Sequence, residues 1–191
     1  MSGWHDFLFL RHGQTDWNVE DRFQGQTDIP LNATGVAQAY RAAERLSHEH
    51  IDRIISSPLI RALKTAAIVA EHLSLPLIVE RELTERHFGP FEGQVVREVK
   101  ANLGLTPDTP IAGHLPPEAE QWPDTKSRSH RSIDRWMVRY PGDRLLFVSH
   151  HGLFAAIAEQ LTNERLQGRN AVPYAFRKQD GEWRVESLEP G

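Results

Sequence analysis

The feature that most constrains this chain is a run of four apolar residues, Phe7-Leu8-Phe9-Leu10, that ends directly in Arg11-His12-Gly13. Four consecutive apolar residues predict a short buried strand. In a parallel α/β sheet, ligands bind in the crevice beyond the carboxyl ends of the strands. Arg11 offers a planar, permanently charged donor for phosphate oxygens, and His12 offers a nitrogen that can attack or carry protons near neutral pH. These three residues alone would also fit a plain polar strand end, so the interpretation depends on the rest of the chain.

Composition excludes several classes of protein. The chain of 191 residues, of which 39% are hydrophobic and 25% charged, favours a single globular domain over residues 1–191. Its net charge of −4 argues against a broad nucleic-acid-binding surface, and no apolar run is long enough to span a membrane. The lack of cysteine excludes disulfides, thiol catalysis and cysteine-liganded zinc. With no signal segment over residues 1–6, we expect a cytoplasmic protein without nucleic-acid or membrane partners, and the oligomeric state stays open.

Strand-like and helical stretches alternate along the chain, which predicts a three-layer α/β fold with helices on both faces of a mostly parallel sheet. The predicted strands cover residues 7–10, 51–56, 76–80 and 145–149, followed by a hairpin of 172–177 and 183–188 around Asp180-Gly181. The predicted helices cover 33–46 after an Asn32 cap, 58–73 after a Ser57 cap, 94–102, 126–139 and 153–161. Proline-rich residues 104–123 predict irregular structure, and residues 90–125 are expected to form a partly irregular lid.

Reactive side chains follow the ends of four predicted strands. They are Arg11-His12, Arg61, Glu85-Arg86 and His150-His151. Arg61 falls in the first turn of a predicted helix, where the positive end of the helix dipole adds to its charge. Two histidines, two arginines and a carboxylate at the ends of parallel strands match what phosphoryl transfer through a histidine needs.

Each of these places also has a simpler explanation. An arginine in the first turn of a helix is usually a solvated surface residue, and Glu85-Arg86 could be an ordinary ion pair. The two adjacent histidines could belong to a metal site. Adjacent residues point apart, however, so zinc would need a further ligand, for which His87 and His114 are the candidates. The combination of the four places favours phosphoryl chemistry over any of these explanations.

Several motifs resemble one known family in their order and spacing. They are Leu10-Arg11-His12-Gly13-Gln14-Thr15-Asp16-Trp17-Asn18, Arg22-Phe23-Gln24-Gly25, Asp28-Ile29-Pro30-Leu31-Asn32, Ser56-Ser57-Pro58-Leu59, Leu83-Thr84-Glu85, Glu92-Gly93 and Val148-Ser149-His150. The chain resembles the histidine phosphatase superfamily, in its branch of cofactor-dependent phosphoglycerate mutases and small phosphatases. Glu120 and Arg128 resemble a later Glu and Arg of that family only loosely.

The resemblance implies a role for each matching residue. His12 would be the nucleophile that becomes phosphohistidine, and Glu85 the general acid and then base, which requires a partly buried carboxyl. The electropositive cradle around the phosphoryl group would consist of Arg11, Arg61 and His150. Phosphoryl or substrate contacts would come from Asn18, Gln24, Gly25, Arg86 and the backbone amide of His151. No metal or cofactor would be needed, because the arginines neutralise the charge of the phosphoryl group.

The chain departs from the family pattern after the second histidine, where His151 replaces a glycine. With Ser149 as the reference point, His150 is the catalytic residue and the side chain of His151 is aimed elsewhere. The alternative assignment makes His151, which precedes Gly152, the catalytic one.

The resemblance leaves the reaction to be decided between hydrolysis and phosphoryl transfer. Phe88 and Val96 stand where mutases of the family carry a tyrosine and a substrate-binding lysine. The segment between Gln94 and Gln121 is also shorter than theirs and lacks their paired arginines. The sequence therefore predicts a phosphatase for a small phosphorylated metabolite, with a mutase as the alternative. A non-catalytic phosphoryl-binding module is a further alternative, although His12, Glu85 and His150 are all present.

Overall fold

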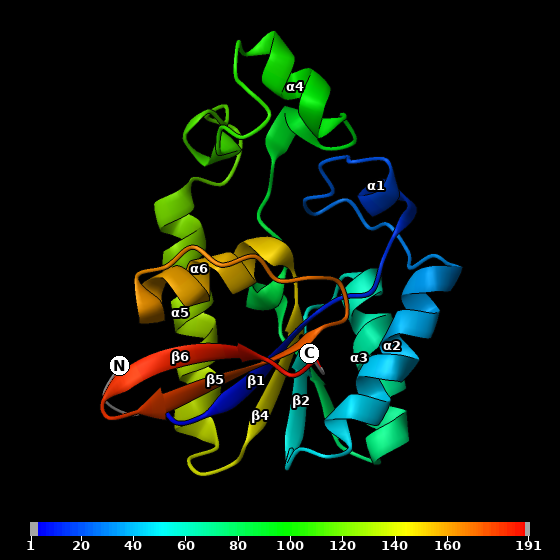
Figure 1. Cartoon of the computed structure of the whole chain (residues 1–191), viewed down its shortest axis with the longest axis vertical. Helices are drawn as coiled ribbons and strands as arrows, with labels where there is room; N and C mark the ends of the chain where they lie inside the picture. Colours follow the sequence, from blue (N-terminus) through cyan, green and yellow to red (C-terminus); the bar gives the residue numbers. More distant parts are fainter. Residues whose placement is uncertain (1–3, 190–191) are drawn as a thin grey trace.

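Six strands form one sheet in the computed structural model, which describes residues 4–189. The strands are β1 (Phe7–Arg11), β2 (Arg53–Ser56), β3 (Leu77–Val79), β4 (Leu145–Ser149), β5 (Pro173–Gln179) and β6 (Glu182–Ser187). Their order across the sheet is β3-β2-β4-β1-β5-β6 (Figure 1). The first four in this order are parallel, and β5 and β6 add an antiparallel hairpin at one edge. The predicted mixed sheet with mainly parallel strands is therefore confirmed.

Alternation of side chains along β1 divides the core into two layers. Phe7 and Phe9 point to one face of the sheet and pack against buried residues of two helices, including Trp136 and Phe154. Leu8 points to the opposite face, as does Leu10, where the layer is built mainly from alanines and aliphatic residues. All four of these apolar side chains are fully buried. Because successive strand residues face opposite ways, an uninterrupted apolar run requires helices on both faces.

The helices provide those two covering layers. Helices α2 (Ala33–Leu46) and α3 (Ile60–Leu73) cover one face, and α5 (Trp122–Arg139) and α6 (His151–Thr162) cover the other. The short helices α1 (Asp16–Val19) and α4 (Val96–Asn102) lie beyond the carboxyl end of β1 (Figure 1). Three 3-10 turns complete the regular structure of the described residues: η1 (Arg81–Leu83), η2 (Gly89–Phe91) and η3 (Ile111–Gly113). The predicted three-layer α/β architecture is confirmed.

Helix α3 begins two residues later than predicted, and Ser57 is not its cap. The backbone N–H of Ile60 is capped instead by the Asp28 carboxylate, at 2.7 Å, from a loop that is distant in sequence. The Ser57 hydroxyl lies 2.8 Å from Nε2 of His150. The local pattern Ser57-Pro58 therefore predicted the wrong helix start, because the Ser57 hydroxyl contacts His150, a residue far along the chain.

Other boundaries differ in smaller ways. Helix α5 begins at Trp122, four residues before the predicted start, with Pro123 in its first turn, where a missing N–H costs little. Helix α1 was not predicted; the Thr15 side chain caps it and Asn18 completes a capping box. The hairpin turn is confirmed, because Asp180 and Gly181 both have positive φ, at 51° and 86°.

The segment from residue 90 to residue 125 contains α4, η3 and otherwise little regular structure until α5 begins. It rises above the carboxyl ends of the parallel strands (Figure 1). None of the helices within residues 4–189 combines the length and apolar character needed to cross a lipid bilayer.

Candidate active site

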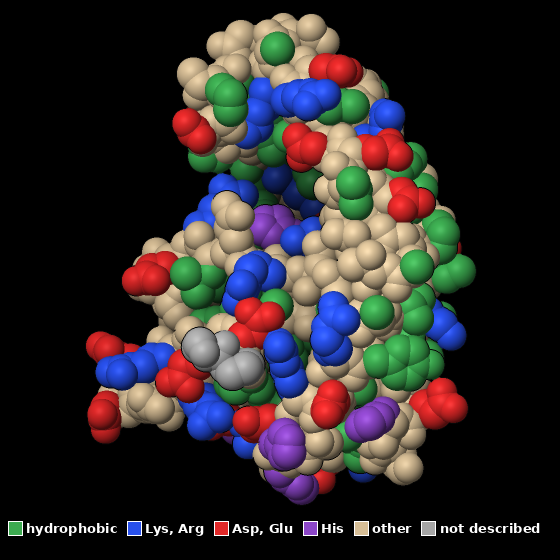
Figure 2. All heavy atoms as spheres, turned by 45° about the vertical axis from the view of Figure 1, so that its right-hand side comes forward, with side chains coloured by type: hydrophobic (Ala, Val, Ile, Leu, Met, Phe, Trp, Pro, Cys, Tyr) green, Lys and Arg blue, Asp and Glu red, His purple; other side chains and the backbone are tan. Residues whose placement is uncertain are grey.

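A cavity of about 440 Å³ opens beyond the carboxyl end of β1. Its wall includes Arg11, His12, Arg61 and Glu85, which reach it from separate parts of the chain. Figure 2 shows a hollow between the upper segment and the body of the molecule, with histidine and Lys or Arg side chains at its floor. The structure thus brings together the histidine, the two arginines and the carboxylate that the sequence singled out.

His12 is held in one tautomer. Its Nδ1–H donates to the Gly13 carbonyl oxygen at 2.7 Å, so the lone pair is on Nε2. The side chain is almost fully buried, and burial is the largest cause that lowers its pKa well below 6.5; the charges of Arg11 and Arg61 lower it further. His12 is therefore neutral at pH 7, as an attacking imidazole must be.

Gly13 is required by a close approach of two segments of backbone. A Cβ atom at this position would lie 2.4 Å from the carbonyl oxygen of Gly35, at the start of α2. The Gly13 N–H donates to the Thr65 hydroxyl at 3.1 Å, which ties the loop after β1 to α3. The carbonyl that orients His12 is thereby fixed by two helices.

Arg61 is buried, contrary to the usual behaviour of an arginine in a first helical turn. It is 0% exposed and donates to the carbonyl oxygens of Thr27 at 2.8 Å and Gly25 at 2.6 Å. Burial is the main cause that lowers its pKa to about 10, which leaves it charged at neutral pH. Its Nε is buried and has no hydrogen-bond partner within residues 4–189. Buried donors of this kind are suited to the oxygens of an anion.

Arg11, the residue directly before His12, is also oriented by a backbone carbonyl. Its Nη1 donates to the Gly168 carbonyl at 3.0 Å, and its buried Nε also lacks a partner among the described residues. Burial lowers the pKa of Arg11, and the charge of Glu85 opposes that effect. The cavity therefore holds two guanidinium groups that are oriented by backbone carbonyls rather than neutralised by ion pairs.

His150 lies beside His12, with 5.2 Å between the ring centroids. It is fully buried, and burial followed by the charge of Arg61 lowers its pKa well below 6.5. Its Nε2 contacts the Ser57 hydroxyl, and its Nδ1 has no partner within residues 4–189. His150 is the residue immediately before α6, so its backbone is fixed by the start of that helix.

Glu85 is held by backbone amides. Both of its carboxylate oxygens accept from the Gly152 N–H at 3.1 Å, and Oε1 also accepts from the Arg86 N–H at 2.7 Å. Gly152 is in the first turn of α6, so the start of that helix fixes the position of the carboxyl group. Glu85 as a whole is only 7% exposed, so the simple explanation of a surface ion pair with Arg86 is wrong.

The structure places the other predicted contact residues unequally. Asn18, Gln24 and Gly25 line the cavity, although Asn18 Oδ1 also accepts from the Thr15 N–H at 3.0 Å and so serves the α1 cap. Arg86 is outside the lining: its Nε donates to the Glu120 carbonyl at 2.7 Å and its guanidinium lies 5.4 Å from the centre of the Trp122 ring. The expected contact between Arg86 and a substrate carboxylate therefore has no support in the structure.

The second of the two adjacent histidines, His151, is also part of the site. His151 lines the cavity, as expected of a residue that contributes its backbone amide to the site, and burial together with the charge of Arg11 lowers the pKa of its imidazole. His151 reaches the cavity because it begins α6, whose first turn points at the cavity. Among the described residues, no group of three or more His, Asp or Glu side chains could hold a metal ion.

Sequence reasoning missed a loop that supports the site from the C-terminal side. In addition to the contact of Gly168 with Arg11, the Asn170 side chain donates to the His12 carbonyl at 2.9 Å and to Asn18 Oδ1 at 3.3 Å. Gln167 joins the cavity lining. This loop has neither helical nor strand periodicity, so only its glycine and asparagine content could have indicated a tight turn near the site.

Comparisons with known proteins agree with this geometry. Residues 7–189 match the histidine phosphatase superfamily (branch 1). The chain is 34% identical to a Bacillus subtilis protein named uncharacterized phosphatase PhoE, covering 80% of this chain and 75% of that one. It is 30% identical to a probable phosphoglycerate mutase GpmB of Yersinia pestis, covering 91% and 85%.

A solved structure extends the agreement to three dimensions. The structure of a mycobacterial glucosyl-3-phosphoglycerate phosphatase matches with a TM-score of 0.81 and 28% identity, over 96% of this chain and 97% of that one. The family match, the curated relatives and the solved structure each cover 80% or more of the chain. The protein therefore belongs to the histidine phosphatase superfamily, in its branch 1.

Proposed function

We propose that the protein is a phosphatase that hydrolyses small phosphomonoesters through a phosphohistidine formed on His12. The observation that carries the proposal is a neutral His12 imidazole with its lone pair on Nε2, close enough to Arg11 and Arg61 for both charges to lower its pKa. A neutral nucleophile beside two fixed positive charges fits a phosphoryl group that carries negative charge.

The reaction takes place in two displacements. First, Nε2 of His12 attacks phosphorus, the phosphorus–oxygen ester bond breaks, and Glu85 gives a proton to the leaving alcohol. Next, Glu85 takes a proton from water, whose oxygen attacks phosphorus and releases inorganic phosphate and free His12. Arg11, Arg61 and His150 hold the phosphoryl oxygens throughout, since the negative charge stays on those oxygens in both steps. No metal and no cofactor takes part.

The remainder of the cavity limits the substrate. Beyond the arginines, the wall includes the apolar side chains of Trp17, Phe23, Phe88 and Ile111. A volume of about 440 Å³ suits a metabolite rather than a folded phosphoprotein. We infer that the substrate is a small phosphorylated molecule of the cytoplasm. We also infer that residues 1–191 form a single domain, in which residues 90–125 act as a partly irregular lid.

Phosphoryl transfer between substrates is the second candidate, because a similar Yersinia protein is named a probable mutase. A mutase must retain its product for rephosphorylation, which needs anchoring charges. The cavity wall has Phe88 and Val96 where mutases of the family carry a tyrosine and a lysine, and Arg86 lies outside it. Hydrolysis is therefore favoured over transfer.

The direct test is to trap the phosphoenzyme. Brief exposure to a ³²P-labelled phosphomonoester should give an acid-labile, base-stable label on the wild-type chain and none on His12→Ala. That variant should also lose several orders of magnitude in turnover, as expected when a nucleophile is removed. Normal turnover of His12→Ala would refute the mechanism. A panel of phosphomonoesters and phosphoglycerates, assayed for free phosphate and for transferred phosphate, separates hydrolysis from transfer.

A further inference from the structure

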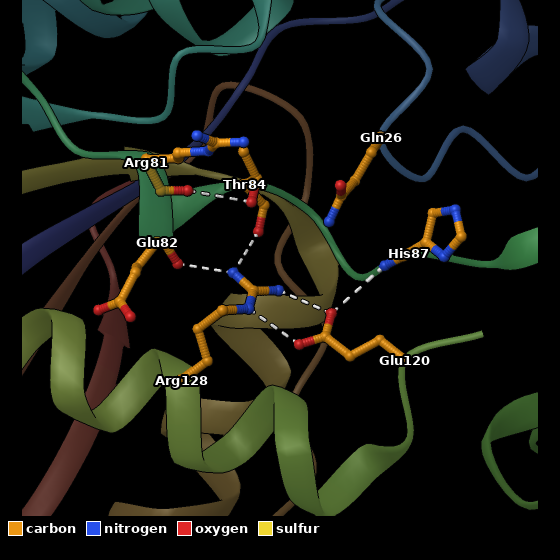
Figure 3. Close-up of a pocket in the computed structure, with 7 residues that line it drawn as sticks. All are labelled: Gln26, Arg81, Glu82, Thr84, His87, Glu120 and Arg128. Carbon is orange, nitrogen blue, oxygen red and sulfur yellow. Dashed lines mark hydrogen bonds and ion pairs between the residues drawn. The ribbon is translucent and has the colours of Figure 1, made fainter. Parts of the chain in front are cut away.

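The loop that carries Glu85, residues 82–88, is held in place by one arginine of α5. Arg128 Nη1 donates to the carbonyl oxygens of Glu82 at 2.6 Å and Thr84 at 2.9 Å, and Nη2 reaches the Glu85 carbonyl at 3.4 Å. Figure 3 shows the first two of these contacts. Three carbonyls within four consecutive residues thus converge on one guanidinium. Between η1 and η2 the loop has no helix or strand of its own, so this side chain replaces regular backbone pairing.

Glu120 fixes that arginine and touches the loop as well. Its two carboxylate oxygens accept from Nε and Nη2 of Arg128, both at 2.8 Å. Glu120 Oε2 also accepts from the His87 N–H at 3.3 Å, and its backbone carbonyl accepts from Nε of Arg86. Both side chains of the pair are only 15% exposed. A two-point pair with this little solvent contact has a single geometry.

The opposite side of the loop is held by a second polar side chain. Gln26 Nε2 donates to the Glu85 carbonyl at 3.1 Å, from the segment that also carries Gln24 and Gly25. Gln26, Thr84, Glu120 and Arg128 together border a cavity of about 550 Å³ behind the loop (Figure 3). The backbone of Glu85 is therefore clamped from two sides, while its carboxylate is held separately by the first turn of α6.

We propose that Arg128, oriented by Glu120, is a positioning residue for proton transfer by Glu85. This inference rests on the proposed function. Arg128 is absent from the lining of the active-site cavity, so it acts through the backbone of the loop. A general acid loses efficiency when it is displaced by about 1 Å from the atom that receives its proton. Loosening the clamp should therefore impair the step that depends on proton delivery and leave phosphoryl binding intact.

The test compares two substrates that differ in their need for a proton. An alkyl phosphate has a poor leaving group and needs the acid, whereas p-nitrophenyl phosphate has a good one. Arg128→Lys keeps the charge but cannot make the two-point pair, and Glu120→Gln keeps the arginine but weakens its orientation. We expect each variant to lose about 10- to 100-fold in kcat on the alkyl phosphate and less than about threefold on p-nitrophenyl phosphate.

The matched control is Arg135→Lys. Arg135 lies two turns further along α5 and pairs with the side chains of Glu80 and Glu82 without touching the loop carbonyls. Arg135→Lys should leave unchanged the ratio of kcat on the alkyl phosphate to kcat on p-nitrophenyl phosphate. Equal losses on both substrates for Arg128→Lys and Glu120→Gln, or no loss, would show that the pair only stabilises the fold and would overturn the inference.

A double-mutant cycle separates this inference from the proposed function. Once Glu85→Gln has removed the acid, adding Arg128→Lys should not change the activity ratio further, because no proton remains to be positioned. Independent, multiplicative effects would overturn the positioning role alone. If Glu85→Gln itself shows no preference between the substrates, the acid role of Glu85 in the proposed function fails and the inference fails with it.

Discussion

Gly152→Ala should displace the carboxyl group of Glu85 while leaving that group chemically unchanged. A Cβ atom at Gly152 would lie 2.4 Å from Glu85 Oε1, whereas ordinary contacts begin at 3.4 Å. The carboxylate must therefore retreat by about 1 Å, since the added Cβ atom is fixed to the backbone of α6 and the Glu85 side chain is the part that can move. A displacement of this size typically costs on the order of 100-fold in rate.

The stability of the same variant should change little. Alanine is favoured over glycine in a helix by about 0.8–1 kcal/mol, and this gain offsets part of the roughly 1–3 kcal/mol cost of weakening the buried hydrogen bonds of Glu85. We expect a folded protein with a melting temperature within several degrees of the wild type. The loss of activity would then report on geometry rather than on unfolding.

The assay measures kcat on an alkyl phosphate and on p-nitrophenyl phosphate, together with inhibition by vanadate. Gly152→Ala should slow the alkyl phosphate strongly, slow p-nitrophenyl phosphate weakly and leave vanadate inhibition intact, because the arginines are untouched. Gly113→Ala is the control, since nothing lies within 4 Å of its Cβ position. Full activity of Gly152→Ala on the alkyl phosphate would refute the placement of Glu85 as the acid.

Three further predictions follow from the site. Activity should survive EDTA and be inhibited by vanadate or tungstate; loss in EDTA with recovery on adding zinc or magnesium would instead support a metal at His150 and His151. Glu85→Gln should lose about 10²–10⁴-fold on an alkyl phosphate and far less on p-nitrophenyl phosphate, whereas Arg61→Ala should slow both alike, as steady-state kinetics would show. Because the lowered pKa values of His12 and His150 mean that the unfolded chain binds more protons below pH 6.5, the free energy of unfolding should fall as the pH drops from 7.5 to 5.5. His150→Asn should flatten this dependence in urea titrations, and an unchanged slope would contradict it.

The sequence predicted those parts of the fold that depend on local patterns. Apolar runs located β1 and β4 within a residue, and periodicity located α2 within its observed bounds. The start of α3 was wrong because the Ser57 hydroxyl bonds to a histidine 93 residues away, which no local rule contains. Burial of Arg61 was likewise beyond local rules, since its partners are carbonyls of a loop 34 to 36 residues earlier.

For the site, the sequence predicted which residue types gather but not what orients them. The strand ends brought Arg11 and His12 toward Glu85 because parallel strands share one carboxyl edge. The sequence singled out Arg128 only through a loose family resemblance, and its contacts were not predictable, because they go to backbone carbonyls 43 to 46 positions away and leave no side-chain pattern at the loop. Backbone carbonyls are present at every residue, so a sequence gives no signal of which ones will be used.

The position of β1 inside the sheet has a consequence for synthesis. The strand that ends directly before His12 pairs on one side with β4 and on the other with β5, so Leu8 lies opposite Leu146 and Ala175. Partners this distant in sequence give a high contact order, which slows folding. Arg11 and His12 leave the ribosome long before β4 and β5, so their strand waits for both of its neighbours to be synthesised. A nascent chain therefore carries the His12 imidazole long before the cavity around it exists, and that cavity is complete only when β4 and β5 have joined the sheet.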